Sequence, residues 1–336
     1  MKIKINNNLI VSNNSKPLLI AEISANHNGS KKKFLNHILQ AKQNGADLVK
    51  IQTYEPQDMI IDKNFKIKKG LWKNKKLWKL YEEAMTPFEW HYDAFKLAKK
   101  KGIELFSTPF SVRGVKFLKQ FKPKIYKIAS FEITDLNLIN EVAKEMRPII
   151  ISTGLASNKE IKEAINTIRK WHNKIIVLYC VSSYPAKLEE VNFNRIKELE
   201  KITKVKNIGF SDHTKGVIAP TISLTFGACI IEKHFKLSEK TKSHDSTFSV
   251  SSNELQLLRK NIDDAYLLLK TNKKKTNNDS LFFRRSIYAT KNIIKGEILT
   301  EDNMACYRPF LGKSANKYNN LLGKKAVKNF KRGKLI

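Results

Sequence analysis

The 336-residue chain is 41% hydrophobic, with 13 Gly and 9 Pro, a composition that excludes a disordered or fibrous protein. Its formal net charge of +32 raises a basic nucleic-acid-binding protein as an alternative, but the Lys and Arg residues are scattered and accompany no helix-turn-helix or RNP-type motif, so we expect no nucleic-acid partner. No apolar run approaches the roughly 20 residues of a membrane span and no signal-peptide pattern is present, so we expect no membrane partner and a cytoplasmic location.

Eight apolar runs, rich in β-branched residues, recur along the chain, and each ends in polar residues. They cover residues 18–24, 47–53, 104–108, 126–130, 148–153, 175–182, 207–213 and 229–235. Segments with helical spacing separate them, and Gly45 and Gly102 suit the ends of two of these helices. Strand followed by helix eight times predicts an α/β protein with a (β/α)8 TIM barrel, whose active site lies at the carboxyl ends of the strands.

The polar strand ends therefore converge on one mouth. They supply Glu22, Lys50, Gln52, Thr108, Lys127, Ser130, Glu132, Ser152, Ser182, Ser211, His213 and His234. Two lysines with several hydroxyls suit an oxyanion such as phosphate or carboxylate. The structural alternative is an internal ion pair of Lys50 or Lys127 with Glu22 or Glu132, which would also place charges inside the mouth.

The last two predicted strands each finish on a histidine. Because alternate side chains of a strand share a face, Ser211 and His213 point the same way, as do Glu232 and His234. If the two strands are neighbours, the imidazoles meet and can hold one divalent cation through neutral ring nitrogens. Each histidine taken alone is equally compatible with a hydrogen-bonded residue near the rim.

The second connection, residues 54–102, is unusually long, so part of it should cover the substrate. Trp78, Tyr81 and Trp90 within it are interpreted as packing residues on an amphipathic helix rather than as ligand contacts.

The chain divides by composition into three predicted parts. Residues 1–270 form the barrel domain, the polar run 271–281 is a linker, and residues 282–336 form a small β-rich domain. A weak internal repeat places Gly296 and Gly333 at turns between strands. About 55 residues make a marginal core, so the small domain is expected to rest on a partner surface.

Eight motifs lie on these elements. They are residues 21–30 (AEISANHNGS), 50–54 (KIQTY), 70–72 (GLW), 106–110 (FSTPF), 126–132 (YKIASFE), 151–154 (ISTG), 211–214 (SDHT) and 232–235 (EKHF). Together they resemble the sialic acid synthase family over nearly the whole chain, and the segment from Ser286, with Tyr307-Arg308-Pro309, resembles its antifreeze-like (SAF) domain. The resemblance implies a TIM barrel plus SAF domain in a homodimer, whose swapped carboxyl-terminal domain caps the partner's barrel.

Members of that family condense phosphoenolpyruvate with an open-chain N-acetylated sugar, which gives a nine-carbon 2-keto acid and phosphate. The resemblance therefore implies a transferase of carbohydrate biosynthesis, with phosphoenolpyruvate and an acetamido sugar as partners and a product destined for a surface glycan or flagellin. It also assigns a divalent metal ion to His213 and His234, with Mn²⁺ as the first choice and Mg²⁺ or Co²⁺ as alternatives.

The same resemblance assigns the remaining site residues. The phosphoenolpyruvate contacts fall on Lys50, Thr108, Lys127, Ser130, Ser152, Ser182 and Ser211. Glu132 matches the residue linked to proton transfer near the aldehyde, and Glu22 lies beside the enolpyruvate site, so these two and the histidines form the expected catalytic set. The sugar contacts fall on Gln52, Tyr184, Asp245 and Arg308, the last of which reaches an acetamido group from the small domain.

The identity of the sugar depends on a few segments. By the same resemblance, residues 126–132 and 70–72 favour 2,4-diacetamido-2,4,6-trideoxy-L-altrose as the sugar and pseudaminic acid as the product. Ser182 stands where neuraminate synthases typically have Asn, and residues 236–246 lack the glycine-rich run often found before Asp245. Synthesis of N-acetylneuraminate or legionaminate from a mannose-type sugar is the alternative.

Overall fold

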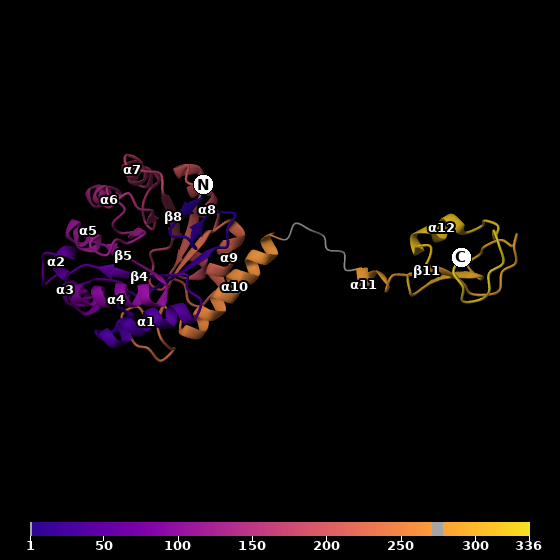
Figure 1. The fold of residues 1–336 in the computed structure, drawn as a ribbon, viewed down its shortest axis with the longest axis horizontal. Coiled ribbons are helices and arrows are strands. Elements are labelled where there is room, and N and C mark those ends of the chain that lie inside the picture. The colour runs from indigo at the N-terminus through magenta and orange to yellow at the C-terminus, as the bar shows by residue number, and fades with distance from the viewer. Residues whose placement is uncertain (1, 271–277) are drawn as a thin grey trace. The chain divides into compact units, whose positions relative to one another are not determined.

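The computed structural model describes residues 2–270 and 278–336, which fall into two compact units divided after Lys270. In the first unit, eight parallel strands close into a barrel in the order β10-β3-β4-β5-β6-β7-β8-β9, with helices around it (Figure 1). The closed barrel confirms the predicted fold class.

The eight barrel strands follow the predicted apolar runs. They are β3 (Leu18–Glu22), β4 (Leu48–Thr53), β5 (Glu104–Pro109), β6 (Tyr126–Ile128), β7 (Ile149–Ser152), β8 (Ile175–Cys180), β9 (Ile208–Asp212) and β10 (Ile230–His234). Strand β10 pairs with both β9 and β3, so the last strand closes on the first. Several residues at the predicted strand ends lie just outside the strands. Ser24 begins the 3-10 helix η1 (Ser24–His27) with φ +45°, Ser130 and Ser182 lie beyond the ends of β6 and β8, and His213 directly follows β9.

Helices cover the outside of the barrel and bury one apolar face each. They are α1 (Lys31–Gln43), α4 (Phe88–Lys101), α5 (Val112–Lys119), α6 (Leu136–Ala143), α7 (Asn158–Arg169), α8 (Asn194–Thr203), α9 (Ile218–Ser223) and α10 (Ser252–Lys270), with η2 (Leu188–Glu190) and η3 (Leu224–Phe226) between them. Gly102 ends α4 with φ +66°, as predicted. No helix in the described part of the chain is both long and apolar enough to cross a membrane.

The long second connection carries two further helices, α2 (Pro56–Met59) and α3 (Leu77–Ala84). Trp90, at the start of α4, packs against the rings of Phe34 and His27 with centroids 5.6 and 5.5 Å away. Trp90 is therefore a packing residue, as predicted.

A short hairpin seals the amino-terminal end of the barrel. Its strands, β1 (Ile3–Lys4) and β2 (Ile10–Val11), pair antiparallel. Ile3, Ile5 and Val11 join the apolar side chains that fill the lower barrel, among them Phe106 and Ile176. The inside of the barrel at this end is a packed core.

The second unit is small and irregular. It contains α11 (Asn278–Leu281), the antiparallel strands β11 (Ser286–Ala289) and β12 (Met304–Tyr307), η4 (Ala315–Lys317) and α12 (Tyr318–Leu321). Its core consists of Ile287, Ala289, Ile293, Leu299, Met304, Ala326, Phe330 and Ile336. Gly296 and Gly333 have φ +89° and +79°, which suits turns. Most of the predicted linker, residues 271–277, lies outside the described residues.

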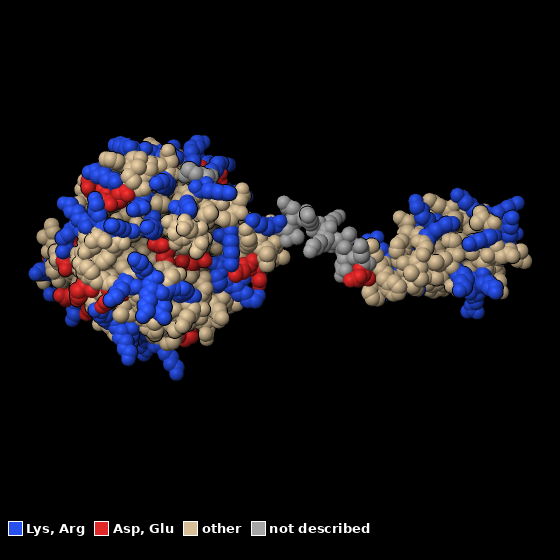
Figure 2. All heavy atoms as spheres, in the orientation of Figure 1, with Lys and Arg blue, Asp and Glu red and all other residues tan. Residues whose placement is uncertain are grey.

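Basic side chains are spread widely over the surface. In Figure 2, Lys and Arg cover much of the visible face of the first unit with Asp and Glu between them, and they also dot the second unit. On this face the described basic residues are dispersed, as the sequence indicates, which suits a general positive potential better than a nucleic-acid groove.

Candidate active site

A cavity of about 450 Å³ opens at the carboxyl ends of the strands. Eleven of the predicted site residues line it: Lys50, Gln52, Lys127, Ser130, Glu132, Ser152, Tyr184, Ser211, His213, His234 and Asp245. Glu22 and Thr108 are buried and do not line it. Ser182 contacts the lining through its hydroxyl, 3.0 Å from that of Ser130. Arg308 belongs to the second unit, where its Nε donates to the Phe283 carbonyl at 2.7 Å.

The floor of the cavity is a buried cluster of two ammonium and two carboxylate groups. Lys50 Nζ lies 2.8 Å from Glu22 Oε2 and 3.2 Å from Glu232 Oε1. Lys127 Nζ lies 3.9 Å from the same Glu232 oxygen, which also accepts a hydrogen bond from Ser211 Oγ at 2.9 Å. The ion pair of Lys50 with Glu22 was the structural alternative, and it is present. Both lysines nevertheless line the cavity, so they can also meet a ligand.

The protonation states of the floor follow from burial and from these pairs. Burial alone would raise the pKa of Glu232, but the charges of Lys127 and Lys50 outweigh it and hold the pKa well below the usual range. Burial lowers the pKa of Lys127 to about 8, so its ammonium is still charged at neutral pH. Burial raises the pKa of Glu22. The floor therefore keeps two cations that an anion can contact.

Several buried polar atoms around the floor have no hydrogen-bond partner. Among the described residues these include Thr108 Oγ1, Ser152 Oγ, Glu132 Oε2, Glu232 Oε2 and His234 Nδ1. Native proteins rarely leave such atoms unpaired, so those at the cavity are available to a ligand or to water. Burial also raises the pKa of Glu132 to about 7, which makes this carboxyl a candidate proton donor near neutral pH.

The two histidines meet as the alternation predicted, with ring centroids 5.4 Å apart. His213 Nδ1 lies 2.8 Å from the Val181 carbonyl oxygen, so this nitrogen carries the hydrogen and Nε2 is left as an electron-pair donor. His234 Nδ1 lies 3.8 Å from Asp245 Oδ2. Burial lowers the pKa of both rings, that of His213 to about 4, so both are neutral at pH 7.

Neutral imidazoles are suitable ligands for a divalent cation. In residues 2–270 and 278–336, no group of three or more His, Cys, Asp and Glu side chains is arranged to hold a metal ion. The pair of neutral rings, with its unpartnered nitrogen on His234, offers nitrogen donors of the kind that a cation can use. A cation held by two protein ligands keeps open positions for oxygen atoms of substrates.

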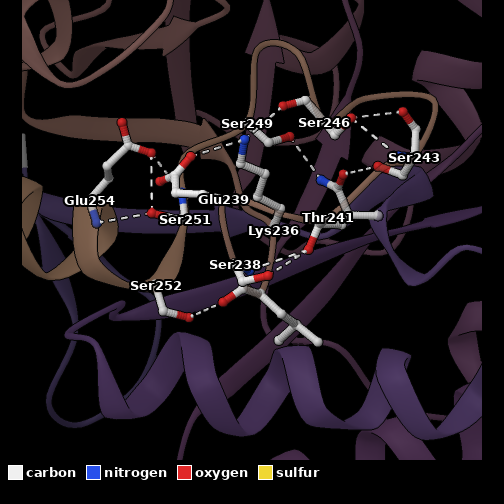
Figure 3. Close-up of polar contacts among 12 residues, drawn as sticks. Lys236, Ser238, Glu239, Thr241, Ser243, Ser246, Ser249, Ser251, Ser252 and Glu254 are labelled. Carbon is white, nitrogen blue, oxygen red and sulfur yellow. Dashed lines mark hydrogen bonds and ion pairs between the residues drawn. The ribbon is translucent and has the colours of Figure 1, made fainter.

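The loop from Lys236 to Ser251, which we call the serine loop, lies between β10 and α10 and is held by its own hydroxyl groups (Figure 3). Lys236 Nζ donates to the Ser246 carbonyl at 3.1 Å, and the hydroxyls of Ser238 and Thr241 are 3.4 Å apart. Ser251 caps α10 by accepting from the Glu254 amide at 3.4 Å.

Asn26 attaches the serine loop to the barrel. Its side-chain amide donates to the Phe235 carbonyl and to Ser249 Oγ, both at 2.9 Å, and its Oδ1 accepts from Ser243 Oγ at 2.6 Å. These bonds hold Asp245 at the cavity, where its Oδ2 accepts from the Ala25 amide at 3.2 Å. No role was predicted for Asn26, and its partner Ser243 is 217 residues away in the sequence.

Apolar side chains form the upper wall of the cavity. Those from the long second connection are Tyr54, Met59, Phe65, Ile67, Trp72, Leu77, Leu80, Tyr81 and Ala84. Trp72 lies over Tyr184, with centroids 6.0 Å apart, and Tyr184 lies 4.4 Å from the ring of His213. The long second connection therefore forms part of the cavity wall, as its predicted position at the mouth requires. Tyr81, interpreted as a packing residue, lines the cavity as well as contacting Tyr54.

Two family models match parts of this chain. The NeuB family matches residues 37–274, and the SAF domain matches residues 284–336. The chain therefore belongs to the NeuB family and is an enzyme of the sialic acid synthase type.

The individual relatives are more specific. The chain is 41% identical to the pseudaminic acid synthase of Campylobacter jejuni, covering 95% of this chain and 94% of the relative. It is 40% identical to that of Helicobacter pylori, covering 94% and 95%, and 35% identical to the N,N'-diacetyllegionaminic acid synthase of Campylobacter jejuni, covering 96% and 99%. A crystal structure of N-acetylneuraminic acid synthetase from Leptospira borgpetersenii in complex with citrate superposes with a TM-score of 0.74 at 29% identity, covering 83% and 94%.

Proposed function

We propose that this enzyme condenses phosphoenolpyruvate with 2,4-diacetamido-2,4,6-trideoxy-L-altrose and water to give pseudaminic acid and phosphate. The observation that carries the proposal is the division of one cavity into a charged floor and an apolar upper wall. The relatives named pseudaminic acid synthases, at 40% and 41% identity over nearly the whole chain, support the choice of sugar. Phosphoenolpyruvate is a product of central metabolism, which favours the cytoplasm as the location.

The floor suits phosphoenolpyruvate, which carries a phosphate and a carboxylate. Lys50 and Lys127 offer ammonium donors, and Ser152 Oγ is a hydroxyl without another partner. We assign the anion to these groups together with Thr108, Ser130, Ser182 and Ser211. Glu232, for which no role was predicted, then holds the two lysines in place by contacting both.

Proton transfer falls to Glu132 in this proposal. Carbon 3 of phosphoenolpyruvate attacks the sugar aldehyde, a carbon–carbon bond forms, and the protonated Glu132 carboxyl gives its proton to the aldehyde oxygen. Water adds to carbon 2, and the proton it releases restores Glu132. The carbon–oxygen bond to phosphate then breaks, and the carbon 2 hydroxyl becomes the ketone by giving its proton to the departing phosphate. The buried Glu22 keeps Lys50 charged beside the enolpyruvate.

We assign the metal to His213 and His234, whose neutral rings fit it. Imidazole ligands favour Mn²⁺ or Co²⁺ over Mg²⁺, which prefers oxygen ligands. When bound, the cation supplies Lewis-acid polarisation of the aldehyde oxygen. The chain's own contribution is to keep both ring nitrogens unprotonated by burial.

The upper wall suits a sugar with a methyl group at carbon 6 and two acetyl groups. Trp72, Phe65 and Ile67 offer apolar surface that such methyl groups can contact. The polar sugar contacts fall on Gln52, Tyr184 and Asp245, of which Gln52 is oriented by its hydrogen bond to Ser24 Oγ at 2.9 Å.

The experiment that tests the function is a phosphate-release assay with two sugars. Phosphoenolpyruvate and the diacetamido sugar should release phosphate with a kcat/KM at least roughly tenfold above that with N-acetylmannosamine, because one well-placed apolar group is worth 1–3 kcal/mol. A preference for N-acetylmannosamine would favour neuraminate synthesis. Release with neither sugar would overturn the proposal.

We further propose a homodimer in which Arg308 of one subunit completes the sugar site of the other. Arg308 is exposed, as are its apolar neighbours Phe283 and Tyr307. On the barrel, Phe131 and Leu155, on the loops after β6 and β7, are 60% and 77% exposed. Two exposed apolar surfaces of this kind support docking of the small unit on a barrel mouth.

Mixing two inactive proteins tests this arrangement. A His213→Ala subunit and an Arg308→Ala subunit should regain part of the activity after subunit exchange, because a mixed dimer pairs one intact barrel with one intact cap. If mixed dimers form and activity stays at the level of the parents, Arg308 does not act across subunits.

A further inference from the structure

A fully buried ion pair lies directly behind the two histidines. Asp212 and Lys233 are both 0% exposed, and Lys233 Nζ lies 2.6 Å from Asp212 Oδ2. The two residues oppose each other in the pairing of β9 with β10. Each directly precedes one of the histidines, so by alternation the pair faces away from the cavity while the rings face into it.

The pair also encloses the turn that carries His213. Asp212 Oδ1 accepts a hydrogen bond from the Thr214 amide at 2.9 Å, and Lys233 Nζ donates to the Thr214 carbonyl. Both backbone groups of Thr214 are thus bound to the two charged side chains. With its ring held by the Val181 carbonyl, His213 is fixed from both sides.

Stability does not explain this pair. Removing two charges from water costs about as much as their attraction returns, and apolar residues of similar volume usually serve as well or better in a core. What an ion pair adds is direction, because the ammonium must meet particular oxygen atoms on a neighbouring strand. Here the ion pair joins the two strand ends that carry His213 and His234, and the distance between these two rings decides whether both can bind one cation.

We propose that Asp212 and Lys233 are positioning residues, which fix the spacing of His213 and His234 and thereby set the affinity for the divalent cation. The inference rests on the proposed metal site. Groups that orient metal ligands from behind typically contribute roughly 10–100-fold to metal affinity.

The test measures metal binding separately from folding. In the Asp212→Asn/Lys233→Met double variant both charges are removed, while the amide oxygen remains available to the Thr214 amide. Chelator-treated protein is titrated with Mn²⁺, and free Mn²⁺ is followed by electron paramagnetic resonance. We expect a Kd for Mn²⁺ that is roughly 10–100-fold higher than wild type, with a Tm within a few degrees of it. The variant also loses the bond from Lys233 to the Thr214 carbonyl, so this turn should open more often and the Thr214 amide should exchange its hydrogen faster in metal-free protein.

A second ion pair provides the matched control. Arg259 Nη1 lies 2.9 Å from Asp47 Oδ2, just before β4 at the sealed end of the barrel. The Asp47→Asn/Arg259→Met variant should lower Tm and leave the Kd for Mn²⁺ unchanged. If it raises the Kd as much as the first variant does, metal affinity follows general stability and the positioning role is wrong.

The remaining outcomes are also decisive. A folded Asp212→Asn/Lys233→Met protein with wild-type Mn²⁺ affinity overturns the positioning role. If that variant does not fold, Asp212→Glu takes its place, because it keeps both charges but displaces the carboxylate by one methylene. A wild-type Kd for Mn²⁺ in the Asp212→Glu protein likewise overturns the positioning role. Wild-type enzyme that binds no Mn²⁺, Co²⁺ or Mg²⁺ contradicts the proposed metal site itself.

Discussion

The two ends of the barrel differ although the same strands build both. At the sealed end, inward side chains are apolar, and at the mouth they are polar. The change from apolar to polar occurs between two successive inward-facing residues, which are two positions apart along a strand. The pairs are Ile20 and Glu22, Leu48 and Lys50, Phe106 and Thr108, Ile125 and Lys127, Ile150 and Ser152, and Ile230 and Glu232.

This difference separates two physical tasks. The lower layer gains stability by burying apolar surface. The upper layer buries charges and unpaired polar atoms, which costs stability unless a ligand compensates them. Substitutions in the two layers should therefore have different consequences.

The largest effect is expected at the proposed metal site. His213→Ala or His234→Ala should lower kcat/KM roughly 10³-fold, because Lewis-acid stabilisation is worth several kcal/mol, and chelation of the wild type should do the same. Phosphate release measures this loss. His172, which is buried outside the cavity, is the control, and His172→Ala should keep metal-dependent turnover. Full activity of chelated His213→Ala protein would exclude the metal role.

In the lower layer, Ile176→Ala should lower the free energy of unfolding by about 2–5 kcal/mol, since it leaves a cavity in a packed core. Denaturant unfolding measures the change. The KM for phosphoenolpyruvate should stay at the wild-type value at temperatures where the variant is folded. A large rise in that KM would show that the two layers are coupled.

An intermediate effect is expected at Glu132. Glu132→Gln should lower kcat roughly 10²-fold. Because the folded-state pKa is raised to about 7, the wild type should lose activity as the pH rises through 7, and the variant should lack this loss. Ionising the buried carboxyl also costs stability above its unfolded pKa, so the variant should have the higher Tm at pH 8. Glu141→Gln, on α6, is the control; a pH profile that persists in Glu132→Gln would assign the proton to another group.

The smallest effect is expected at Asn26. Asn26→Ala removes three hydrogen bonds, two of which reach the serine loop, so the KM for the sugar should rise roughly tenfold through Asp245 while that for phosphoenolpyruvate changes little. Steady-state kinetics with each substrate varied gives the comparison. Ser238→Ala, in the exposed part of the same loop, should change neither value. Equal rises in both KM values would mean that Asn26 supports the whole mouth.

Much of the fold and floor was predictable because the strand pattern is local. Runs of Ile, Leu and Val ending in Lys, Ser or His predicted the barrel and brought His213 and His234 together. The same alternation predicted an inward Glu232, although its contacts with both lysines could not be known. The loops were not predictable in this way: Asn26 meets Ser243 only after the barrel closes, and Trp90 and Tyr81, equally aromatic, separate into core and cavity wall.

Closure of the barrel by its last strand has a consequence for synthesis. A nascent chain that has emerged as far as β9 contains Lys50, Lys127 and His213, but it lacks Glu232 and His234, which β10 supplies. Until β10 leaves the ribosome and pairs with β3, Lys127 has no Glu232 to meet and the lower layer is open along one edge. The catalytic mouth is therefore assembled after translation of nearly the whole first unit, and truncation before β10 should yield an unclosed sheet that depends on chaperones.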